Sequence, residues 1–434
     1  MQPAARRRAR AGLELGALRP YNGGTPDSFQ PLPLVRTGER MSTMMEQLLR
    51  EEHLAVRETA RKFALEAVLP GAADRDEKEE FPAALVRQLA DLGFLGLPYA
   101  EEWGGAGLDT LAYCIAVEEI ARVDASLAIT LAAHVSLGCG PINAFGTDAQ
   151  KKRFLVPLVS GKGLGAFGLT EPNAGSDAGG TQTTAVRDDG GWRVNGTKIY
   201  ITNGSVAQVV VFTAKTDKTK GTRGISSFIV ETNTPGFKVG KHEKKMGLRS
   251  SDTVELHFEN MFVPGDQLLG AENQGYKQFL STLAGGRISI GAMSLGIAQG
   301  AYDAAVKYAM ERKQFGQPIA EFQAIQFMLA DMALKIQAAR HLVYDAAWRK
   351  DKGLQYQKEG AMAKLYASEA STWCADRAIQ VHGGMGYMRE MHVERYYRDA
   401  KLMEIGEGTS EIQRIVIAKN LLKEAGYAWE GEKG

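Results

Sequence analysis

The chain has 434 residues, a formal net charge of +1 and 44% hydrophobic residues. This length and composition predict a soluble globular protein of two to four domains with an ample core. The near-neutral charge, with no long basic run beyond the N-terminus, excludes nucleic acid as the main partner. The three cysteines, Cys114, Cys139 and Cys374, are widely spaced among apolar residues, which predicts buried free thiols in a reducing compartment. The seven histidines show no metal-ligand spacing, so we predict no metal site.

The first 40 residues differ in composition from the rest of the chain. Arginines from Arg6 to Arg19 are set among Ala, Gly, Leu and Pro with little periodicity. Three interpretations stay open: a mitochondrial transit peptide, a disordered tail, or translation that truly starts at Met41 or Met44. Acidic residues and a scarcity of Ser and Thr argue against the transit peptide. We therefore expect residues 1–43 to be a non-structural extension of a bacterial-type cytoplasmic protein; a transit peptide would place it in the mitochondrial matrix.

Residues 44–163 show helical periodicity. A first helix presents one apolar face, and Phe81-Pro82 predicts the start of another after an acidic linker. The stretch 125–147 has no charged residue and is long enough to span a bilayer. Because Ser, Thr, His, Gly and Pro interrupt it, we predict a buried helix that ends in a turn, and no membrane. The residues of the first apolar face are Leu49, Val56, Ala60, Phe63 and Ala67.

Residues 164–272 change to a period of two. Apolar and polar residues alternate from Thr253 to Glu259, as in a half-exposed antiparallel strand. Asn195-Gly196 and Asn203-Gly204 predict tight turns between strands. This zone is therefore predicted to be a β domain.

Residues 273–434 are helical again. Spacings of three and four continue over more than three heptads, which is typical of a bundle seam. Similar stripes predict a preceding helix at 286–311 and a following one at 359–381. The predicted fold is thus mainly α with a central β domain: an N-terminal helical domain, a middle β domain and a C-terminal bundle. The seam residues are Phe322, Ile325, Leu329, Met332, Ile336, Ala339, Val343 and Ala346.

The glycine run Gly383-Gly384-Met385-Gly386 is not a dinucleotide fingerprint of the Rossmann type. Such a fingerprint follows a strand and opens a helix, whereas this run closes a helix. Gly383 suits a left-handed C-cap there. We reject NAD binding on this basis.

Three other segments could carry chemistry. Residues 167–170 and 200–203 combine strand-like sequence with aromatics and hydroxyls, which suits one side of a flat heteroaromatic ring, although threonines are ordinary in strands. Residues 312–316 offer a cation, an amide and an aromatic at a break between helices, which suits a pyrophosphate or a simple helix C-terminus. Glu407 lies between Gly406 and Gly408, which lets a ligand approach closely; most such carboxylates are merely solvated.

Taken together, these segments resemble the acyl-CoA dehydrogenase family. Two long stretches, 168–180 and 380–414, carry the resemblance, with support from 101–105 and 312–316. The resemblance runs from about Leu48 to the last helix. It implies an N-terminal helical domain, a middle β-barrel-like domain and a C-terminal four-helix bundle, with FAD between the last two, completed by a neighbouring subunit of a homotetramer.

The resemblance also assigns residues. Against the flavin ring it places Phe167, Leu169, Thr170, Tyr200, Ile201 and Thr202. To the adenosine and pyrophosphate it assigns Arg312, Gln314, Phe315, Gln323, Gln380, Gly383 and Gly384, partly across the subunit interface. Near the cofactor it also places Thr409 and Glu411, and along the acyl-CoA channel Ser176, Arg287 and Gly408.

The implied reaction is the α,β-dehydrogenation of an acyl-CoA to a trans-2-enoyl-CoA. Glu407 removes the α-proton, while its backbone N–H and a ribityl hydroxyl polarise the thioester carbonyl. The β-hydrogen leaves as a hydride to flavin N5, and electrons pass to an electron-transferring flavoprotein. We expect the bound acyl chain to desolvate Glu407 and raise its pKa toward neutrality.

Departures from the family pattern bear on the substrate. Some relatives keep the base just before Arg287, where this chain has Gly286, so Glu407 has no rival. Many straight-chain relatives have Tyr before the base, where this chain has Gly406, which should widen the pocket for branched groups. Ala284 stands where relatives commonly have Asp, so one substrate contact of the family is missing. Residues 123–138 contain no Lys or Arg that could bind a second carboxylate, which argues against dicarboxylic substrates. We expect a short- to medium-chain acyl-CoA, straight or branched.

Two alternatives stay open. One is an acyl-CoA oxidase that passes electrons to oxygen. The other is a catalytically inactive acyl-CoA-binding scaffold, against which the intact Glu407 argues. A helical interaction module without a ligand would not explain the hydroxyl-rich turns of the β zone.

Overall fold

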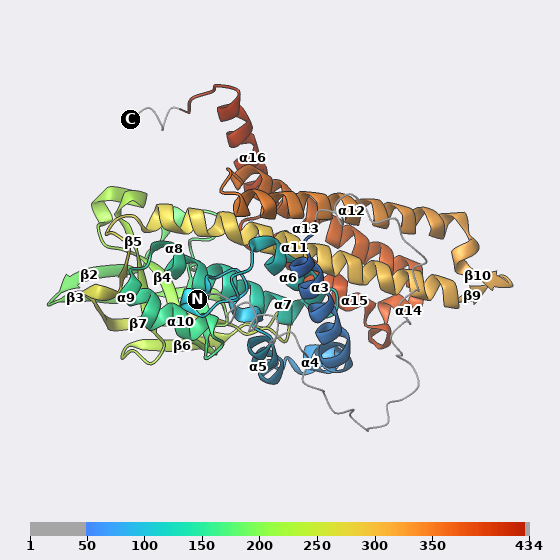
Figure 1. The fold of residues 1–434 in the computed structure, drawn as a ribbon, viewed down its shortest axis with the longest axis horizontal. Helices are drawn as coiled ribbons and strands as arrows, with labels where there is room; N and C mark the ends of the chain where they lie inside the picture. The colour runs from blue at the N-terminus through green and yellow to red at the C-terminus, as the bar shows by residue number, and fades with distance from the viewer. Residues whose placement is uncertain (1–48, 430–434) are drawn as a thin grey trace.

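The computed structural model describes residues 49–429, and the predictions for residues 1–43 lie outside this range. Helices come first, a sheet lies in the middle of the sequence, and long helices follow (Figure 1). The sheet occupies one end of the molecule, and the long helices extend away from it to the other end. The predicted fold class, mainly α with a central β domain, is confirmed.

The N-terminal zone packs short helices around α6, all of whose residues are buried. The predicted acidic linker is wrong, because its residues form helix α4, whose buried Asp76 accepts hydrogen bonds from Arg398. The helix predicted after Phe81-Pro82 is confirmed as α5. The helices are α3 (Glu51–Phe63), α4 (Ala72–Lys78), α5 (Ala83–Asp91), α6 (Thr110–Ala121), α7 (Ala125–Ala132), α8 (Gly140–Phe145), α9 (Asp148–Gln150) and α10 (Val156–Val159).

The uncharged stretch predicted to be a buried helix runs continuously through α7, a π-helical turn at Ala133–Cys139, and α8. Among the described residues, Ala125–Phe145 is the segment with the length and hydropathy of a membrane span, and 83% of its apolar window is buried inside the protein. The prediction of a buried helix is confirmed. All three cysteines are buried free thiols, as predicted.

The middle zone is an eight-stranded sheet in the order β6-β7-β3-β2-β4-β5-β8, with β1 pairing in parallel with β4. Along this path β6 and β8 lie at opposite edges, so the sheet is curved around a core but open. In β7 the residues Val254, Leu256 and Phe258 are buried and their neighbours are not, which confirms the predicted alternation. The strands are β1 (Leu164–Gly168), β2 (Thr184–Asp188), β3 (Gly191–Thr202), β4 (Ala207–Lys215), β5 (Ile225–Glu231), β6 (Phe237–His242), β7 (Thr253–Pro264) and β8 (Leu268–Leu269).

One predicted turn is wrong and the other is confirmed. Asn195-Gly196 lies inside β3, where the pairing with β7 shifts register at a bulge. Glycine is required there by close approach, because a Cβ at Gly196 would lie 2.4 Å from the hydroxyl oxygen of Thr183. Asn203-Gly204 does turn the chain out of β3, with Asn203 at a φ of 64°.

The C-terminal zone is a bundle built on α11, α12 and α13, with α15 and α16 packed against α13. The predicted seam on α12 is fully buried from Met332 onward, while its first residues are only partly buried. Gly383 has a φ of 59° but a ψ of −137°, so the predicted left-handed C-cap is wrong; this conformation favours glycine and leads into α14. The elements are α11 (Gly275–Glu311), β9 (Lys313–Gln314), β10 (Gln317–Pro318), α12 (Gln323–Asp351), α13 (Gln357–His382), α14 (Gly384–Tyr387), α15 (Val393–Met403) and α16 (Ser410–Glu424).

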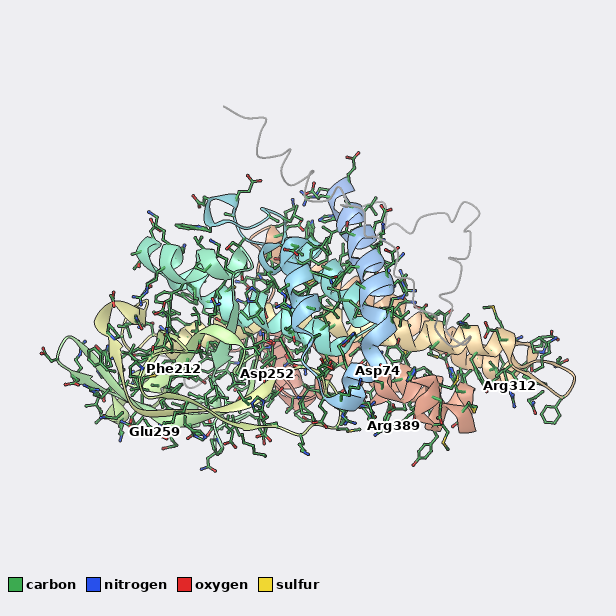
Figure 2. The ribbon with its side chains drawn as sticks, turned by 90° about the horizontal axis from the view of Figure 1, so that it is seen from below. Asp74, Phe212, Asp252, Glu259, Arg312 and Arg389 are labelled. Atoms are coloured by element: carbon green, nitrogen blue, oxygen red, sulfur yellow. The ribbon has the colours of Figure 1, made fainter. Side chains whose placement is uncertain are left out.

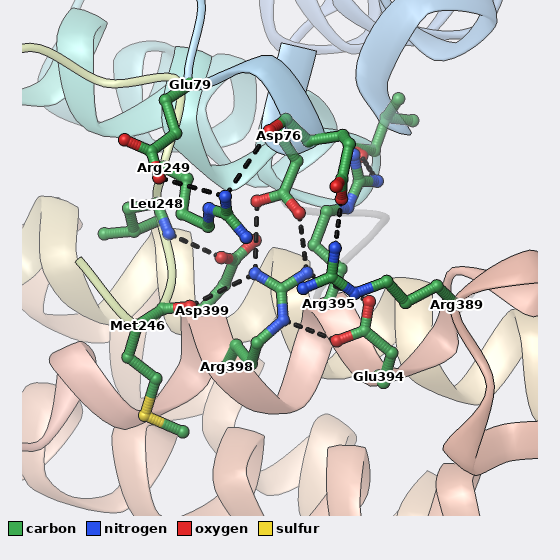
Figure 3. A network of polar contacts seen from close by, with 12 residues as sticks. Asp76, Glu79, Met246, Leu248, Arg249, Arg389, Glu394, Arg395, Arg398 and Asp399 are labelled. Carbon is green, nitrogen blue, oxygen red and sulfur yellow. Dashed lines mark hydrogen bonds and ion pairs between the residues drawn. The ribbon is translucent and has the colours of Figure 1, made fainter. Parts of the chain in front are cut away.

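A charged network fixes α15 against the other two zones (Figure 3). Arg398 donates to both carboxylate oxygens of Asp76 on α4, at 3.1 and 2.6 Å, and to the Met246 carbonyl in the loop before β7. Buried Asp399 accepts from the Leu248 N–H in the same loop at 2.6 Å. Since α15 ends four residues before Glu407, this network sets where the following loop begins.

Candidate active site

Glu407 occupies a tight loop between α15 and α16. Its φ is 52°, and that of Gly408 is 96°, so two successive residues are left-handed. For a non-glycine residue such a conformation costs about 1–3 kcal/mol and persists only when its surroundings enforce it. The loop ends at Thr409, which is the N-cap of α16.

Two buried side chains enforce the loop by donating to its carbonyls. The Gln413 amide on α16 donates to the main-chain carbonyl oxygen of Glu407 at 3.2 Å and to that of Gly408 at 2.9 Å. The Lys364 ammonium on α13 donates to the same Gly408 oxygen at 2.8 Å. Sequence reasoning missed both. The signal was a lysine on an otherwise apolar helix face, next to Ala363 and Ala367.

The carboxylate of Glu407 turns inward against α11. Part of the residue is exposed at the surface, but its Oε2 is buried and has no hydrogen-bond partner among the described residues. A Cβ placed on Gly286 would lie 2.0 Å from this oxygen. The carboxylate thus fills the space that a side chain at Gly286 would need.

The electrostatics of this carboxylate suit a base. Burial raises the pKa of Glu407 to about 7, against the opposing charges of Lys364 and Arg287. Burial lowers the pKa of Lys364 to about 8, and Glu407 opposes that shift. Arg287 on α11 is itself buried, and its Nε has no partner among the described residues. A carboxylate whose pKa lies near 7, with two buried cations acting on it, can accept a proton at physiological pH.

The residues expected at the flavin ring gather at adjoining strand ends. Phe167 lies in β1, Leu169 and Thr170 follow it, and Thr202 ends β3. The Ile199 N–H donates to the Thr170 carbonyl at 2.9 Å, which joins the two segments.

Their side chains differ in exposure. Tyr200 is left-handed, with a φ of 59°, and is 63% exposed. The side chain of Ile201 lies in the core of the sheet, so only its main chain can face a ligand. Exposed Tyr200 and the half-buried Thr170 and Thr202 hydroxyls leave a surface that fits a flat polar-edged ring such as isoalloxazine.

A buried ion pair supports this surface. The Lys198 ammonium, fully buried in β3, donates to the Glu171 carboxylate at 2.6 Å and to the Leu169 carbonyl at 3.3 Å. The same carboxylate accepts from the Thr181 hydroxyl at 2.9 Å. The sequence alone assigned no role to either Glu171 or Lys198.

Helix α7 links the ring surface to the region of Glu407. The Asn203 amide after β3 donates to the Thr130 carbonyl at 3.0 Å. Two residues along, the Ala132 carbonyl accepts from the Tyr113 hydroxyl at 3.2 Å. Burial raises the pKa of Tyr113, and the charge of Glu407 adds to that shift.

The remaining predicted cofactor residues lie elsewhere. Phe315 lies in the turn of the β9–β10 hairpin and Arg312 caps α11 directly before β9, at the end of the molecule opposite the sheet (Figures 1 and 2). Arg312 follows Gly286 by 26 residues along α11, or about 39 Å of helix. Phe315 is 93% exposed. The structure does not bring these residues to Glu407 within one chain.

The other expected residues lie in several separate places. Gln323 begins α12 beyond the hairpin, and the exposed Gln380, Gly383 and Gly384 lie at the far end of α13. Ser176 is exposed in the loop after β1, while Glu411 is exposed in the first turn of α16. Within residues 49–429, no cluster of three or more His, Cys, Asp or Glu could hold a metal ion.

Three family models match the chain in succession: the acyl-CoA dehydrogenase N-terminal domain over residues 50–162, the middle domain over 166–261 and the C-terminal domain over 273–422. The chain is 54% identical to a probable acyl-CoA dehydrogenase, YngJ, of Bacillus subtilis over 376 residues, which are 86% of this chain and 99% of the relative.

Two solved structures are similar as well. One is butyryl-CoA dehydrogenase from Megasphaera elsdenii, with a TM-score of 0.85 at 46% identity over 86% of this chain and 99% of that one. The other comes from a study of the electron transferring flavoprotein of Acidaminococcus fermentans, with a TM-score of 0.86 at 48% identity over the same shares. With these matches along its length, the chain belongs to the acyl-CoA dehydrogenase family, whose cofactor is FAD.

Proposed function

We propose that this protein dehydrogenates a short- to medium-chain acyl-CoA to the trans-2-enoyl-CoA, with Glu407 as the base. The observation that carries the proposal is the inward, hydrogen-bond-free Oε2 of Glu407, whose pKa burial raises to about 7. A carboxylate in this state can remove a weakly acidic α-proton near neutral pH.

Different residues of the chain have different roles in the proposed reaction. Glu407 takes the α-proton and holds it on its carboxylate. The buried guanidinium of Arg287 offsets the negative charge that develops on the substrate as the proton leaves. The surface of Thr170, Tyr200 and Thr202 would hold the flavin ring. FAD, when bound, supplies the acceptor for the β-hydrogen as hydride.

The substrate range follows from Gly406. A Cβ at this position would meet the Leu402 carbonyl at 3.5 Å, an ordinary contact, so a side chain fits there and its absence leaves room. We propose that this room admits branched short acyl groups beside straight ones. The similarity to butyryl-CoA dehydrogenase supports the short length.

A second copy of the chain completes the cofactor site in this proposal. Arg312, Gln314 and Phe315 lie too far along α11 to reach a flavin beside Glu407 in their own chain. The exposed Phe315 and the exposed Phe327 and Leu334 on α12 support burial against a partner. We infer a homo-oligomer, with a tetramer as the family pattern.

Further parts of the proposal concern context. We propose electron-transferring flavoprotein as the electron acceptor, which the similarity to the Acidaminococcus fermentans study supports. We also propose cytoplasmic localisation and domain limits of 44–163, 164–272 and 273–434, supported by the change from α10 to β1 and the start of α11 at Gly275.

Anaerobic mixing of the purified holoenzyme with a panel of acyl-CoAs tests the function. We expect flavin bleaching that is fastest with four- to eight-carbon chains, and turnover with electron-transferring flavoprotein. Bleaching followed by rapid oxygen uptake without that acceptor would indicate an oxidase. A flavin-loaded enzyme that no acyl-CoA bleaches would indicate the inactive scaffold.

A further inference from the structure

Lys364 is a buried cation that the proposed reaction does not use directly. It lies on α13 with no exposed surface, among buried alanines at 361, 363 and 367. Burying an ammonium in such surroundings is costly unless it is paired and hydrogen-bonded. Its position therefore calls for a specific partner.

That partner is the loop that carries Glu407. The Lys364 ammonium donates to the Gly408 oxygen at 2.8 Å, one residue after the base. The carboxylates of Glu407, Glu404 and Glu411 act on it from the loop and α16, and the Arg287 guanidinium from α11. Gln413 binds the same loop carbonyls without adding a charge. The loop is thus held by one charged and one neutral donor.

We propose that Lys364 is a positioning residue for the base: its hydrogen bond holds the left-handed turn at Glu407 and Gly408, and its charge favours the ionised carboxylate in the resting enzyme. This inference rests on the proposed function of Glu407. Burial raises the pKa of Glu407, and the charges of Lys364 and Arg287 oppose that rise. Without Lys364, Arg287 is the one of these two cations that remains. The base would then be protonated over a wider range of pH.

The test is the pH profile of kcat/KM for Lys364→Met, which keeps the apolar stem and removes the charge and the donor. An opposite charge within reach lowers a carboxyl pKa by about 1–3 units, so its loss should move the acidic limb up by about one pH unit or more. We also expect kcat at neutral pH to fall about tenfold to a hundredfold, because the carboxylate is displaced.

Two further variants separate charge from geometry. Gln413→Leu removes the neutral donor, so kcat should fall while the acidic limb stays in place. Lys364→Arg keeps a charge and a donor, so the limb should return toward that of the parent. If Lys364→Met does not fold, Lys364→Gln replaces it, and the same limb shift is expected.

Lys358→Met serves as the matched control, since Lys358 lies on the same helix and pairs with Glu424 at 2.6 Å. It should leave both the limb and kcat unchanged. An acidic limb within about 0.3 units of the parent in Lys364→Met, or in Lys364→Gln, would overturn the inference. Glu407→Gln distinguishes the two levels: if it stays active, the proposed function fails, and if only Lys364→Met is silent, the positioning role alone fails.

Discussion

The Glu407 loop and the β9–β10 hairpin use the same backbone device for different ends. Each places two successive left-handed residues between helices, Glu407 and Gly408 in one, Phe315 and Gly316 in the other. The first is closed over by buried donors from α13 and α16. The second stands free at the end of the molecule, with Phe315 almost fully exposed. The first is assembled within the chain, whereas we propose that the second is half of a site that a partner subunit completes.

The difference lies in what satisfies the strained turn. In the hairpin, pairing of Gln314 with Gln317 satisfies the main chain locally, and two positive φ values are the ordinary geometry of a two-residue hairpin. In the Glu407 loop the carbonyls depend on side chains 6 and 44 residues away. The hairpin can therefore form without tertiary support, whereas the base loop cannot.

The largest effect should come from Glu407→Gln. This variant should retain FAD and bind acyl-CoA, yet lose dehydrogenation by about 10²-fold or more, since the general base is removed. Single-turnover flavin bleaching measures the loss. Activity above about a tenth of the parent would remove Glu407 from its role.

Gly286→Ala should have the next largest effect. The new methyl group would lie 2.0 Å from the Glu407 oxygen and must displace the carboxylate, so we expect kcat to fall about tenfold or more. Gly285→Ala is the matched control, because its Cβ meets only the Lys350 ammonium at 3.4 Å. Equal activities of the two variants would show that the inward carboxylate does not represent the reactive state.

Phe315→Ala tests the other side of the comparison. The folded monomer should lose little stability, because the ring is 93% exposed and meets the Phe322 ring edge-on, at a centroid distance of 5.9 Å. FAD retention and subunit association should weaken together, as followed by native mass spectrometry and flavin release on dilution. Val186→Ala, another exposed apolar residue, should change neither. Tight FAD binding by a Phe315→Ala monomer would contradict a shared cofactor site.

The smallest effect should come from Gly406→Tyr. The ring would narrow the pocket beside the base, so kcat/KM should fall several-fold for branched acyl-CoAs and less for straight ones. Competition assays with paired straight and branched thioesters measure the ratio. Equal losses for both sets would dissociate Gly406 from substrate shape.

Patterns of period and turn chemistry predicted the fold well where local sequence decides the structure. The alternation in β7 and the long stripe on α12 are of this kind. Local sequence failed at Asn195-Gly196, where the glycine allows the close approach of Thr183, the residue before β2. It failed likewise at α4, whose run of charges gave no apolar stripe although Asp76 is buried against Arg398.

The residues of the candidate site also differ in whether local sequence or tertiary contacts decide their role. Glu407 could be proposed from its glycine neighbours and the resemblance, because both are local in sequence. A lysine on an apolar helix face marks Lys364 as unusual, but its role and that of Gln413 depend on a contact between α13, α16 and a loop that only the folded chain creates. The separation of Arg312 from the base depends likewise on the length and direction of α11.

Proton abstraction by Glu407 is the central claim, and exchange of α-hydrogens tests it without hydride transfer. Acetyl-CoA has α-hydrogens but no β-hydrogens, so the holoenzyme in D2O can exchange its methyl protons without oxidising it. The base must be ionised, so the exchange rate followed by proton NMR should be low below pH 6, rise through about pH 7 and level off above it. Glu407→Gln should abolish this exchange, and a Glu407→Gln enzyme that exchanges at the parental rate would contradict the account.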